Sequence, residues 1–308
     1  MKYLKLIRFQ NLLLLAFMQL IFRYGFLKLQ NIETALAHWQ YALLVLSTVL
    51  IAAGGYVIND IFDQDTDEEN KPEKVIVGKS VSETTAYYIY AGVTLVGVSI
   101  GFYLSNLIMR PGFASIFIMI SALLYFYATN LKQMLLIGNL AVAFLLSFSV
   151  LIVGVFDIFP ATADDNRRTM TLMFSILKDY AIFAFVINFI REIVKDMQDI
   201  QGDTSQGMST LPITIGVKWT TKIVAVLLVI STVVLLIYVN AHLMVNELYY
   251  ATIYALVLVV APLLFCLVKV WNATSKADFS QLSKILKWII FFGILSVLIV
   301  TLNINHNA

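Results

Sequence analysis

Two short segments of the chain carry aspartates at the same spacing. On an α-helix, residues three and then four positions apart share one face, so each segment predicts an acidic stripe along a helix. Carboxylates one turn apart repel each other, and the helix dipole further disfavours anions near a helix C-terminus. A bound cation would offset both effects. The six aspartates are Asp60, Asp63 and Asp67 in the first segment and Asp196, Asp199 and Asp203 in the second.

The ligand type indicates which metal the two stripes would bind. Neither segment contains histidine or cysteine, and clustered carboxylates alone favour Mg²⁺ over zinc. Mg²⁺ uses few carboxylates and fills its remaining positions with water and phosphate oxygens. Two facing stripes could therefore clamp a diphosphate through bridging metal ions. One motif alone also fits a solvated helix end, but its repetition favours Mg²⁺ as cofactor and all six aspartates as catalytic metal ligands.

Basic residues near the stripes are candidates for substrate binding. A diphosphate held by metal ions retains oxygens that lysine or arginine can bind, although any single lysine could instead be a topology signal. The candidates are Arg8 and Asn11 at the start of the first apolar segment, Lys71 after the first stripe, Lys132 in a short segment between two apolar runs, and Arg191 and Lys195 beside the second stripe.

The composition indicates what kind of element positions these residues. The chain has 308 residues, 60% of them hydrophobic and 13% charged, and its mean hydropathy is +0.85. A helix that crosses a bilayer needs about 20 apolar residues. We therefore predict an all-α integral membrane protein, with nine transmembrane helices in one bundle that forms a single domain over residues 1–308. The nine apolar segments are 11–26, 41–58, 85–107, 112–128, 134–156, 172–190, 223–240, 248–270 and 285–302.

The distribution of lysine and arginine predicts the orientation of the bundle. Cytoplasmic loops of membrane proteins are enriched in these residues, so we expect a cytoplasmic N-terminus. The two aspartate motifs then open charged cytoplasmic loops, 60–84 and 192–221, which we expect to cap an active site that faces the cytoplasm. No targeting segment is evident, which favours the cell membrane. Of the 21 basic residues, the opposite side keeps only Arg23, Lys28, Arg110, Arg167, Arg168 and Lys178.

One acidic cluster on that opposite side has a simpler interpretation. Asp157, Asp164 and Asp165 precede two arginines in a segment between apolar runs, and we interpret them as a solvated loop. The composition shows no basic patch that would favour nucleic acid, and no feature predicts an obligate protein partner. The expected partners are membrane lipids and lipophilic substrates.

The two motifs resemble the paired signatures of the UbiA-type intramembrane prenyltransferases. The first motif, with Asn59 before Asp60, resembles their NDxxDxxxD sequence, and the second resembles their DxxxD-type motif. Segment 191–203 is most similar to the branch that includes the digeranylgeranylglyceryl phosphate synthases. Further similar elements are Arg8-x-x-Asn11, Tyr127 to Lys132 followed by Gly138-Asn139, and Thr210-Leu-Pro with Gly216, whereas Asn70-Lys71-Pro72 departs from the usual Asn-Arg-Pro.

The resemblance implies a transferase that moves an alkyl group other than methyl and releases diphosphate. The expected reaction is Mg²⁺-dependent transfer of a polyprenyl group, here geranylgeranyl, from a diphosphate donor to a prenylglyceryl phosphate hydroxyl in ether-lipid synthesis. It also implies that Asn59 and Tyr127 bind substrate. Phe62, Tyr125 and Tyr127 could stabilise a carbocation through their π faces, although packing is the favoured interpretation of these rings.

Two alternatives remain open at this stage. The acceptor could be aromatic, either a quinone precursor or a tetrapyrrole. A protein of a different class, a cation transporter, could also place acidic residues beside membrane spans. Transporters usually hold such residues near the bilayer midplane, whereas both motifs here follow the ends of apolar segments.

Overall fold

The computed structural model describes residues 1–70, 72–73 and 75–307, and these residues are almost entirely helical. The α-helices are α1 (Lys2–Leu6), α2 (Phe9–Leu20), α3 (His38–Phe62), α4 (Gln64–Asn70), α5 (Glu83–Leu107), α6 (Ala114–Thr129), α7 (Ile137–Val153), α8 (Arg167–Ser205), α9 (Leu211–Ile215), α10 (Val217–Val239), α11 (Tyr249–Ala255), α12 (Ala261–Trp271) and α13 (Lys276–Asn307). The π and 3₁₀ turns are η1 (Ile21–Leu27), η2 (Pro111–Phe113), η3 (Leu131–Gln133), η4 (Gly154–Ile158), η5 (Phe159–Ala161), η6 (Asn240–Met244) and η7 (Leu256–Val260).

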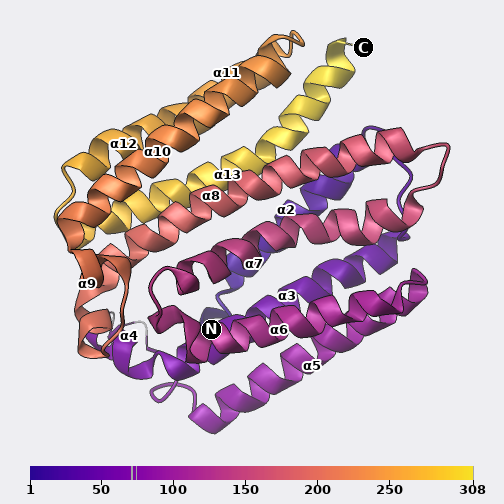
Figure 1. The fold of residues 1–308 in the computed structure, drawn as a ribbon. Helices are drawn as coiled ribbons and strands as arrows, with labels where there is room; N and C mark the ends of the chain where they lie inside the picture. The colour runs from indigo at the N-terminus through magenta and orange to yellow at the C-terminus, as the bar shows by residue number, and fades with distance from the viewer. Residues whose placement is uncertain (71, 74, 308) are drawn as a thin grey trace.

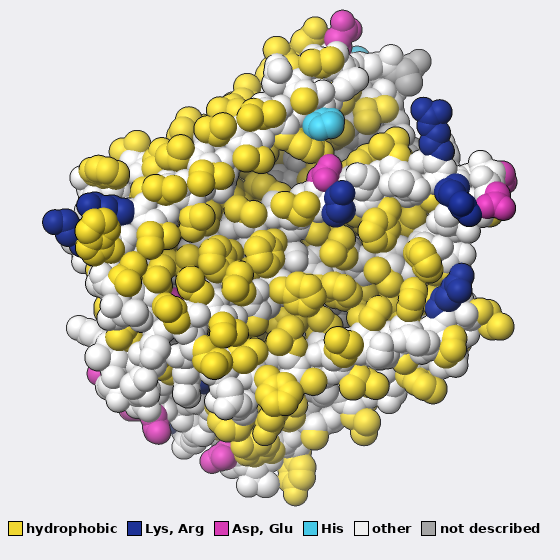
Figure 2. Space-filling view, viewed as in Figure 1, with side chains coloured by type: hydrophobic (Ala, Val, Ile, Leu, Met, Phe, Trp, Pro, Cys, Tyr) yellow, Lys and Arg dark blue, Asp and Glu magenta, His cyan; other side chains and the backbone are white. Residues whose placement is uncertain are grey.

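Nine of the helical segments in the described ranges are long and apolar enough to cross a bilayer. Each overlaps one of the nine predicted segments. The π turn η1 continues α2, and the π turn η7 joins α11 to α12, so neither interrupts the apolar run. Figure 1 shows these helices side by side in one bundle. Hydrophobic side chains cover the middle of the face in Figure 2, whereas charged side chains lie mostly toward its rim. This distribution fits a surface in contact with lipid.

Small residues allow the helices to approach closely. A Cβ atom at Gly101 of α5 would lie 2.3 Å from the Phe117 ring of α6, and one at Gly293 of α13 would lie 2.1 Å from the Phe183 ring of α8. Because lipid tails are as apolar as the side chains, helices in a membrane associate mainly through such close packing. α8 lies against both α7 and α13, which places the second aspartate motif between neighbouring helices.

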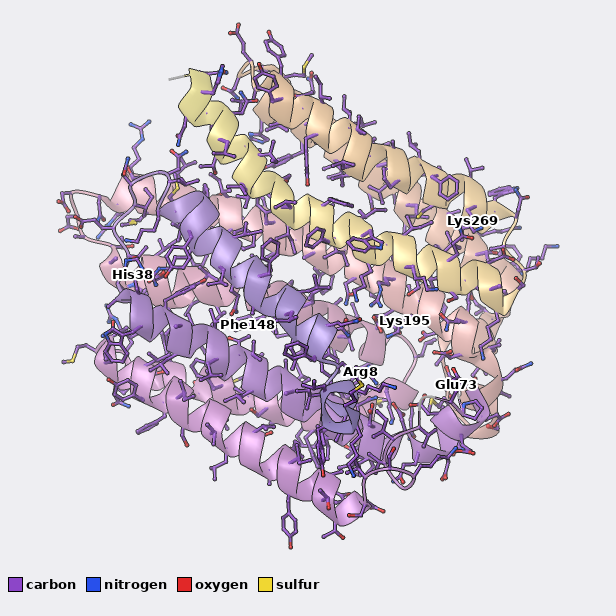
Figure 3. All side chains as sticks on the ribbon, turned by 180° about the vertical axis from the view of Figure 1, so that it is seen from behind. Arg8, His38, Glu73, Phe148, Lys195 and Lys269 are labelled. Atoms are coloured by element: carbon purple, nitrogen blue, oxygen red, sulfur yellow. The ribbon has the colours of Figure 1, made fainter. Side chains whose placement is uncertain are left out.

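The polar elements gather at one end of the bundle. α4 and α9 lie together at the left of Figure 1, and the N-terminus lies between them and the middle of the picture. Figure 3, from behind, shows Arg8 and Lys195 near this end and His38 near the other. The short segment predicted between the fourth and fifth apolar runs is confirmed as a helical hairpin, since α6 ends at Thr129, α7 begins at Ile137 and η3 lies between them. The hairpin brings Lys132 to the same end.

At the opposite end, the prediction of a solvated Asp157 is wrong. The side chain of Asp157 is fully buried, because η4 continues the helix beyond its predicted end. Its carboxylate accepts a hydrogen bond from the Leu36 amide at 3.0 Å and forms an ion pair with Arg23 at 3.0 Å. A buried charge needs such a partner. Asp164, by contrast, is exposed as expected.

Removing this carboxylate should destabilise the fold. Asp157→Ala leaves Arg23 buried without its partner, a loss that typically costs about 3–5 kcal/mol. We expect a clearly lower thermal unfolding temperature in detergent, whereas Asp164→Ala at an exposed position should leave it nearly unchanged. Replacing both members of the pair by leucine should restore much of the stability. Equal unfolding temperatures for the two alanine variants would show that the pair is not structural.

Candidate active site

The first aspartate motif lies at a bend and not on one straight helix. α3 ends at Phe62, and Asp63 follows with φ −100° and ψ 5°, after which α4 begins. The Gln64 side chain donates to the Ile61 carbonyl oxygen at 2.9 Å, which satisfies one acceptor at the helix end. The prediction of a continuous stripe is therefore wrong for this motif. The bend turns Asp63 toward Asn59 and Lys132, both of which contact its carboxylate.

The second motif does continue a helix, as its spacing predicts. α8 extends without a break to Ser205 and carries all three aspartates. The predicted loop 192–221 is consequently helical over its first part and contains α9 as well. Asp196 accepts a hydrogen bond from the side-chain amide of Asn139 on α7 at 2.8 Å. This contact fixes the stripe against the neighbouring helix.

Asn70 holds the two motifs together. Its side-chain amide donates to the Asp199 carbonyl oxygen at 3.0 Å and accepts from the Gly202 amide at 3.0 Å. A Cβ atom at Gly202 would lie 2.4 Å from the Asn70 side chain, so the absence of a side chain on α8 permits this close contact. α4, which carries Asp67, therefore packs directly on the turn of α8 that carries the second motif.

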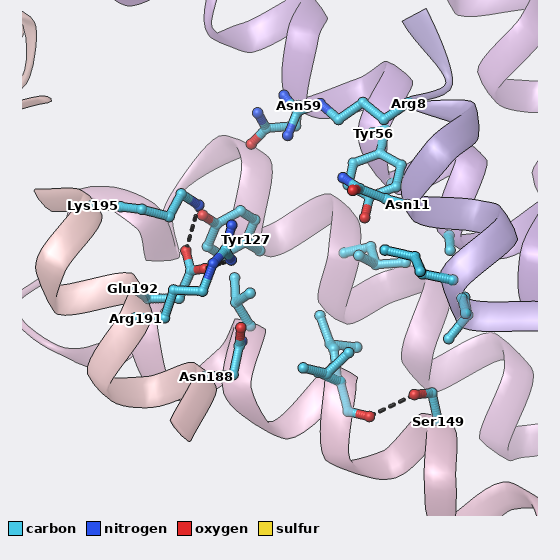
Figure 4. Close-up of a pocket in the computed structure, with 18 of the residues that line it drawn as sticks. Arg8, Asn11, Tyr56, Asn59, Tyr127, Ser149, Asn188, Arg191, Glu192 and Lys195 are labelled. Atoms are coloured by element: carbon cyan, nitrogen blue, oxygen red, sulfur yellow. Dashed lines mark hydrogen bonds and ion pairs between the residues drawn. The ribbon is translucent and has the colours of Figure 1, made fainter. Parts of the chain in front are cut away.

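A cavity of about 520 Å³ lies between the helices at this end. Its polar end contains carboxylates, cations and amides, and Figure 4 shows Arg8, Asn11 and Tyr56 on one side with Arg191, Glu192 and Lys195 on the other. Its apolar part extends into the bundle between α2, α3, α6, α7 and α13. A cavity of this size with convergent polar groups at one end is typical of a small-molecule site.

The structure brings most of the predicted site residues to this cavity. Asp60 does not line it, and Lys71 lies outside the described residues. The predicted residues that line the cavity are Arg8, Asn11, Asn59, Asp63, Asp67, Tyr127, Lys132, Arg191, Lys195, Asp196, Asp199 and Asp203. The two aspartate motifs, more than a hundred residues apart in the sequence, thus contribute to the same cavity.

Arg8 enters the site from a strained turn. It adopts a left-handed conformation, with φ 50° and ψ 51°, between α1 and α2. This conformation costs about 1–2 kcal/mol for a residue with a side chain. An ion pair with Asp60 at 2.8 Å and the ring of Tyr56, 5.0 Å from the guanidinium, hold the side chain in place. Asp60 therefore orients a cavity cation in this structure.

A second group of cations surrounds a buried carboxylate. Glu192 is 5% exposed and accepts from Arg191 at 3.0 Å and from Lys195 at 2.7 Å (Figure 4). Arg191 also donates to the Ser283 carbonyl oxygen of α13 at 3.2 Å. These bonds position both cations at the cavity wall. Glu192 shares the helix face of the second motif, a spacing that could have identified it from the sequence.

Sequence reasoning missed other polar residues of the cavity. Asn70, Asn188 and Lys287 line it, but none was a candidate site residue, because none belongs to a repeated spacing. Lys287 comes from α13, where the sequence indicated only a basic residue at the cytoplasmic end of a membrane span. Their recruitment depends on how distant helices pack.

The three aromatic candidates separate into two environments. Tyr127 lines the cavity. Phe62 and Tyr125 do not, and their rings instead contact each other edge to face at 6.3 Å on an exposed part of the helices. The packing interpretation therefore holds for Phe62 and Tyr125.

The donor set fits Mg²⁺ by chemical type. Five carboxylates of the two motifs line the cavity, and Mg²⁺ accepts one or two carboxylates together with phosphate oxygens and water. In the described part of the chain, no three carboxylate, histidine or cysteine side chains form a ready metal cage. The arrangement therefore suits a metal that arrives with a phosphate ligand better than a permanently enclosed ion.

Comparison with known proteins identifies the family. The model of the UbiA prenyltransferase family matches residues 24–302. The chain belongs to the UbiA prenyltransferase family. A relative from Methanosphaera stadtmanae, a digeranylgeranylglyceryl phosphate synthase, is 30% identical over 245 residues, which cover 78% of this chain and 80% of the relative. Together with its nine apolar helices, membership in this family makes the chain a multi-pass membrane protein.

Another relative matches over a shorter region. The digeranylgeranylglyceryl phosphate synthase of Methanothermobacter thermautotrophicus is 34% identical over 183 residues. This alignment covers 58% of each protein, so the chain matches less than two thirds of the length of that relative.

Solved structures show the same UbiA fold. A structure of digeranylgeranylglyceryl phosphate synthase superposes with a TM-score of 0.65 at 23% identity and covers 97% of both chains. A UbiA homologue from Archaeoglobus fulgidus, bound to GPP and Mg²⁺, superposes with a TM-score of 0.57 at 15% identity and covers 96% of this chain and 99% of its own.

Proposed function

We propose that the chain is a Mg²⁺-dependent prenyltransferase that transfers a geranylgeranyl group from its diphosphate to the hydroxyl of a prenylglyceryl phosphate. The main observation is that two aspartate motifs and several cations meet at the polar end of one apolar cavity. A metal-bound diphosphate fits the polar end, and an isoprenoid tail fits the apolar part. The relatives named as digeranylgeranylglyceryl phosphate synthases support the lipid acceptor.

In this proposal the aspartates bind the metal ion and the basic residues bind the phosphate oxygens. Asp63, Asp67, Asp196, Asp199 and Asp203 would hold Mg²⁺, and Asp60 would join them if it releases Arg8. When bound, Mg²⁺ would neutralise the charge that develops on the leaving diphosphate. The remaining phosphate oxygens accept hydrogen bonds from the cavity cations, among which Lys71 is also proposed. The amide of Asn59 and the hydroxyl of Tyr127 complete the proposed set of substrate contacts.

These contacts promote departure of the diphosphate. The allylic C1–O bond breaks with its electron pair on the diphosphate. The acceptor hydroxyl oxygen then bonds to C1 and gives its proton to the departing diphosphate. Lys132 stabilises the departing anion because it is held at the polar end. The apolar wall keeps water away from the carbocation, which would otherwise be hydrolysed. The ring of Tyr127 can stabilise the cation through its π face.

The depth of the cavity supports a donor of moderate length. Along α3 the lining residues extend from Asn59 to Thr48, roughly 16 Å at 1.5 Å per residue. One amino-acid residue has three backbone bonds and spans at most about 3.5 Å when extended. An isoprene repeat has four chain bonds, so by the same scale it spans roughly 4.5 Å, and the cavity holds about three to four repeats. Near this end Gln19 is fully buried and donates to Thr48 at 3.3 Å and to the Ser149 carbonyl oxygen at 3.0 Å.

The residues beyond the deep end of the cavity argue against the transporter alternative. An ion path would continue past the deep end of the cavity toward the charged pair of Arg23 and Asp157. Neither residue lines the cavity, and each is buried against the other. A cytoplasmic N-terminus in the cell membrane, with a cytoplasm-facing site and residues 1–308 as one domain, remains part of the proposal and rests on the distribution of lysine and arginine.

The function can be tested with purified full-length protein in liposomes that contain Mg²⁺. Geranylgeranyl diphosphate should be offered with geranylgeranylglyceryl phosphate, hydroxybenzoate, naphthoate or a tetrapyrrole alcohol or acid, and lipid products identified by mass spectrometry. We expect release of pyrophosphate and a doubly prenylated glyceryl phosphate, with lower turnover for a donor of eight isoprene units. If only an aromatic compound were prenylated, the assignment of a lipid acceptor would be wrong. If no acceptor gave turnover, the proposed prenyltransferase activity would be refuted.

A further inference from the structure

Lys287 differs from the other cations of the cavity. Arg8 and Lys132 each pair with an aspartate of the first motif, and Arg191 and Lys195 pair with Glu192. Within the described ranges, Lys287 forms no ion pair, and its ammonium group donates to the Asn11 side-chain oxygen at 2.8 Å. Among the described residues, no acidic side chain therefore occupies its ammonium group, which can contact an anion in the cavity.

A second cation lies beside Lys287. Arg191 donates to the carbonyl oxygen of Ser283, which precedes Lys287 by one helical turn on α13. Both cations line the cavity. Two neighbouring positive charges repel each other, and an anion between them would replace this repulsion with attraction.

The helix face below Lys287 is apolar. Ile290, Phe291 and Ile294 of α13 also line the cavity, and their spacing places them on the same face as Lys287. This face thus presents a cation at the polar end and an apolar strip deeper in the bundle. The shape and polarity match a lipid that carries an anionic headgroup on an apolar chain.

We propose that Lys287, positioned by Asn11 and assisted by Arg191, binds the phosphate of the acceptor lipid. This inference rests on the proposed function, since it names the part of that site that recognises the acceptor. A reaction between a prenyl diphosphate and a glyceryl phosphate brings two anions into one cavity, and each requires its own cations. The aspartate motifs with their metal ions serve the diphosphate. Lys287 has no ion pair to either motif among the described residues, so it serves the second anion.

Steady-state kinetics of Lys287→Gln test this assignment. We expect the KM for geranylgeranylglyceryl phosphate to rise about tenfold or more, because a charge-assisted hydrogen bond is lost, while the KM for geranylgeranyl diphosphate stays within about twofold. Lys287→Arg, which keeps the charge, should recover part of the affinity. Lys284→Gln is the matched control, since this exposed lysine lies on the same helix and does not line the cavity.

Equilibrium binding provides a readout that does not depend on turnover. The probe is geranylgeranylglyceryl phosphate with hydrogen in place of the reactive hydroxyl, compared with the same lipid without its phosphate. Lys287→Gln should weaken binding of the phosphorylated probe about tenfold and leave the unphosphorylated lipid unchanged.

The outcomes separate this inference from the proposed function. An increase in the donor KM alone, or an unchanged affinity for the phosphorylated probe, would overturn the assignment of Lys287 while the prenyltransferase activity persists. Absence of turnover in the wild-type protein with every acceptor would refute the proposed function itself. If Lys287→Gln does not fold, as judged by loss of donor binding, the same comparison with Lys287→Arg decides the assignment through its effect on probe affinity.

Discussion

Asparagine in place of Asp63 should reduce turnover by about 10²–10³-fold, because it removes a charge that the metal-bound diphosphate requires in the transition state. Asp63 lines the cavity and contacts both Asn59 and Lys132. The substitution preserves the size of the side chain, so the protein should still fold. The rate of pyrophosphate release at saturating donor and acceptor measures the effect.

A neighbouring aspartate provides the matched control. Asp65 lies two residues after Asp63, is exposed and does not line the cavity. Asp65→Asn changes the net charge of the segment by the same amount and should keep nearly full activity. If both variants lost activity equally, the effect would come from the charge of the segment and not from the position of Asp63 in the site.

Removal of divalent metal should stop the reaction completely. Three aspartates of α8 line the cavity, and without Mg²⁺ their carboxylates would repel the negatively charged diphosphate. Treatment with EDTA should lower turnover to background, and addition of excess Mg²⁺ should restore it. Ca²⁺ should restore less, because its longer metal–oxygen distances and larger coordination number alter the geometry of the clamp.

The unfolding temperature of the wild-type protein, measured with and without EDTA, shows whether metal removal affects the fold as well as the activity. The described part of the chain has no preformed metal cage, so EDTA should not unfold the protein. A large decrease in the unfolding temperature on chelation would indicate a structural metal and contradict this interpretation. Persistent turnover in EDTA would contradict the metal-dependent mechanism.

The parts of the fold that depend on local pattern were predictable from the sequence. The apolar segments have the length of bilayer-spanning helices, and the stripe of α8 follows from the helical period alone. The turn that holds Lys132 was predictable because so few residues separate two apolar runs. Each of these features depends on residues that are close in the sequence.

Features that depend on packing between distant helices were not predictable. At the bend, the carboxylate of Asp63 contacts Asn59 and also Lys132, which lies in η3, far away in the sequence. The buried carboxylate of Asp157 forms its ion pair with Arg23, which lies more than a hundred residues earlier in the sequence. Lys287 enters the site because α13 lies beside α8, and its sequence surroundings indicate only the cytoplasmic end of a membrane span.

Asn70 illustrates the same limit within the site itself. In the sequence it is the first residue of a short motif after the first aspartates, with no indication of its partner. In the structure it bonds to the backbone of Asp199 and Gly202 and thereby joins the two motifs. The spacing predicted that both motifs bind the same metal–diphosphate group. The contact that joins the two motifs depends on the side-chain amide of Asn70.

The central claim is that both motifs bind one metal–diphosphate group. The most direct test is the affinity for geranylgeranyl thiolodiphosphate, a donor analogue that resists ionisation, measured by calorimetry with and without Mg²⁺. We expect the wild-type protein to bind it only with Mg²⁺, and Asp63→Asn and Asp199→Asn each to weaken that binding by at least about tenfold. Mg²⁺-dependent binding at wild-type affinity in either variant would show that its motif is not part of the clamp.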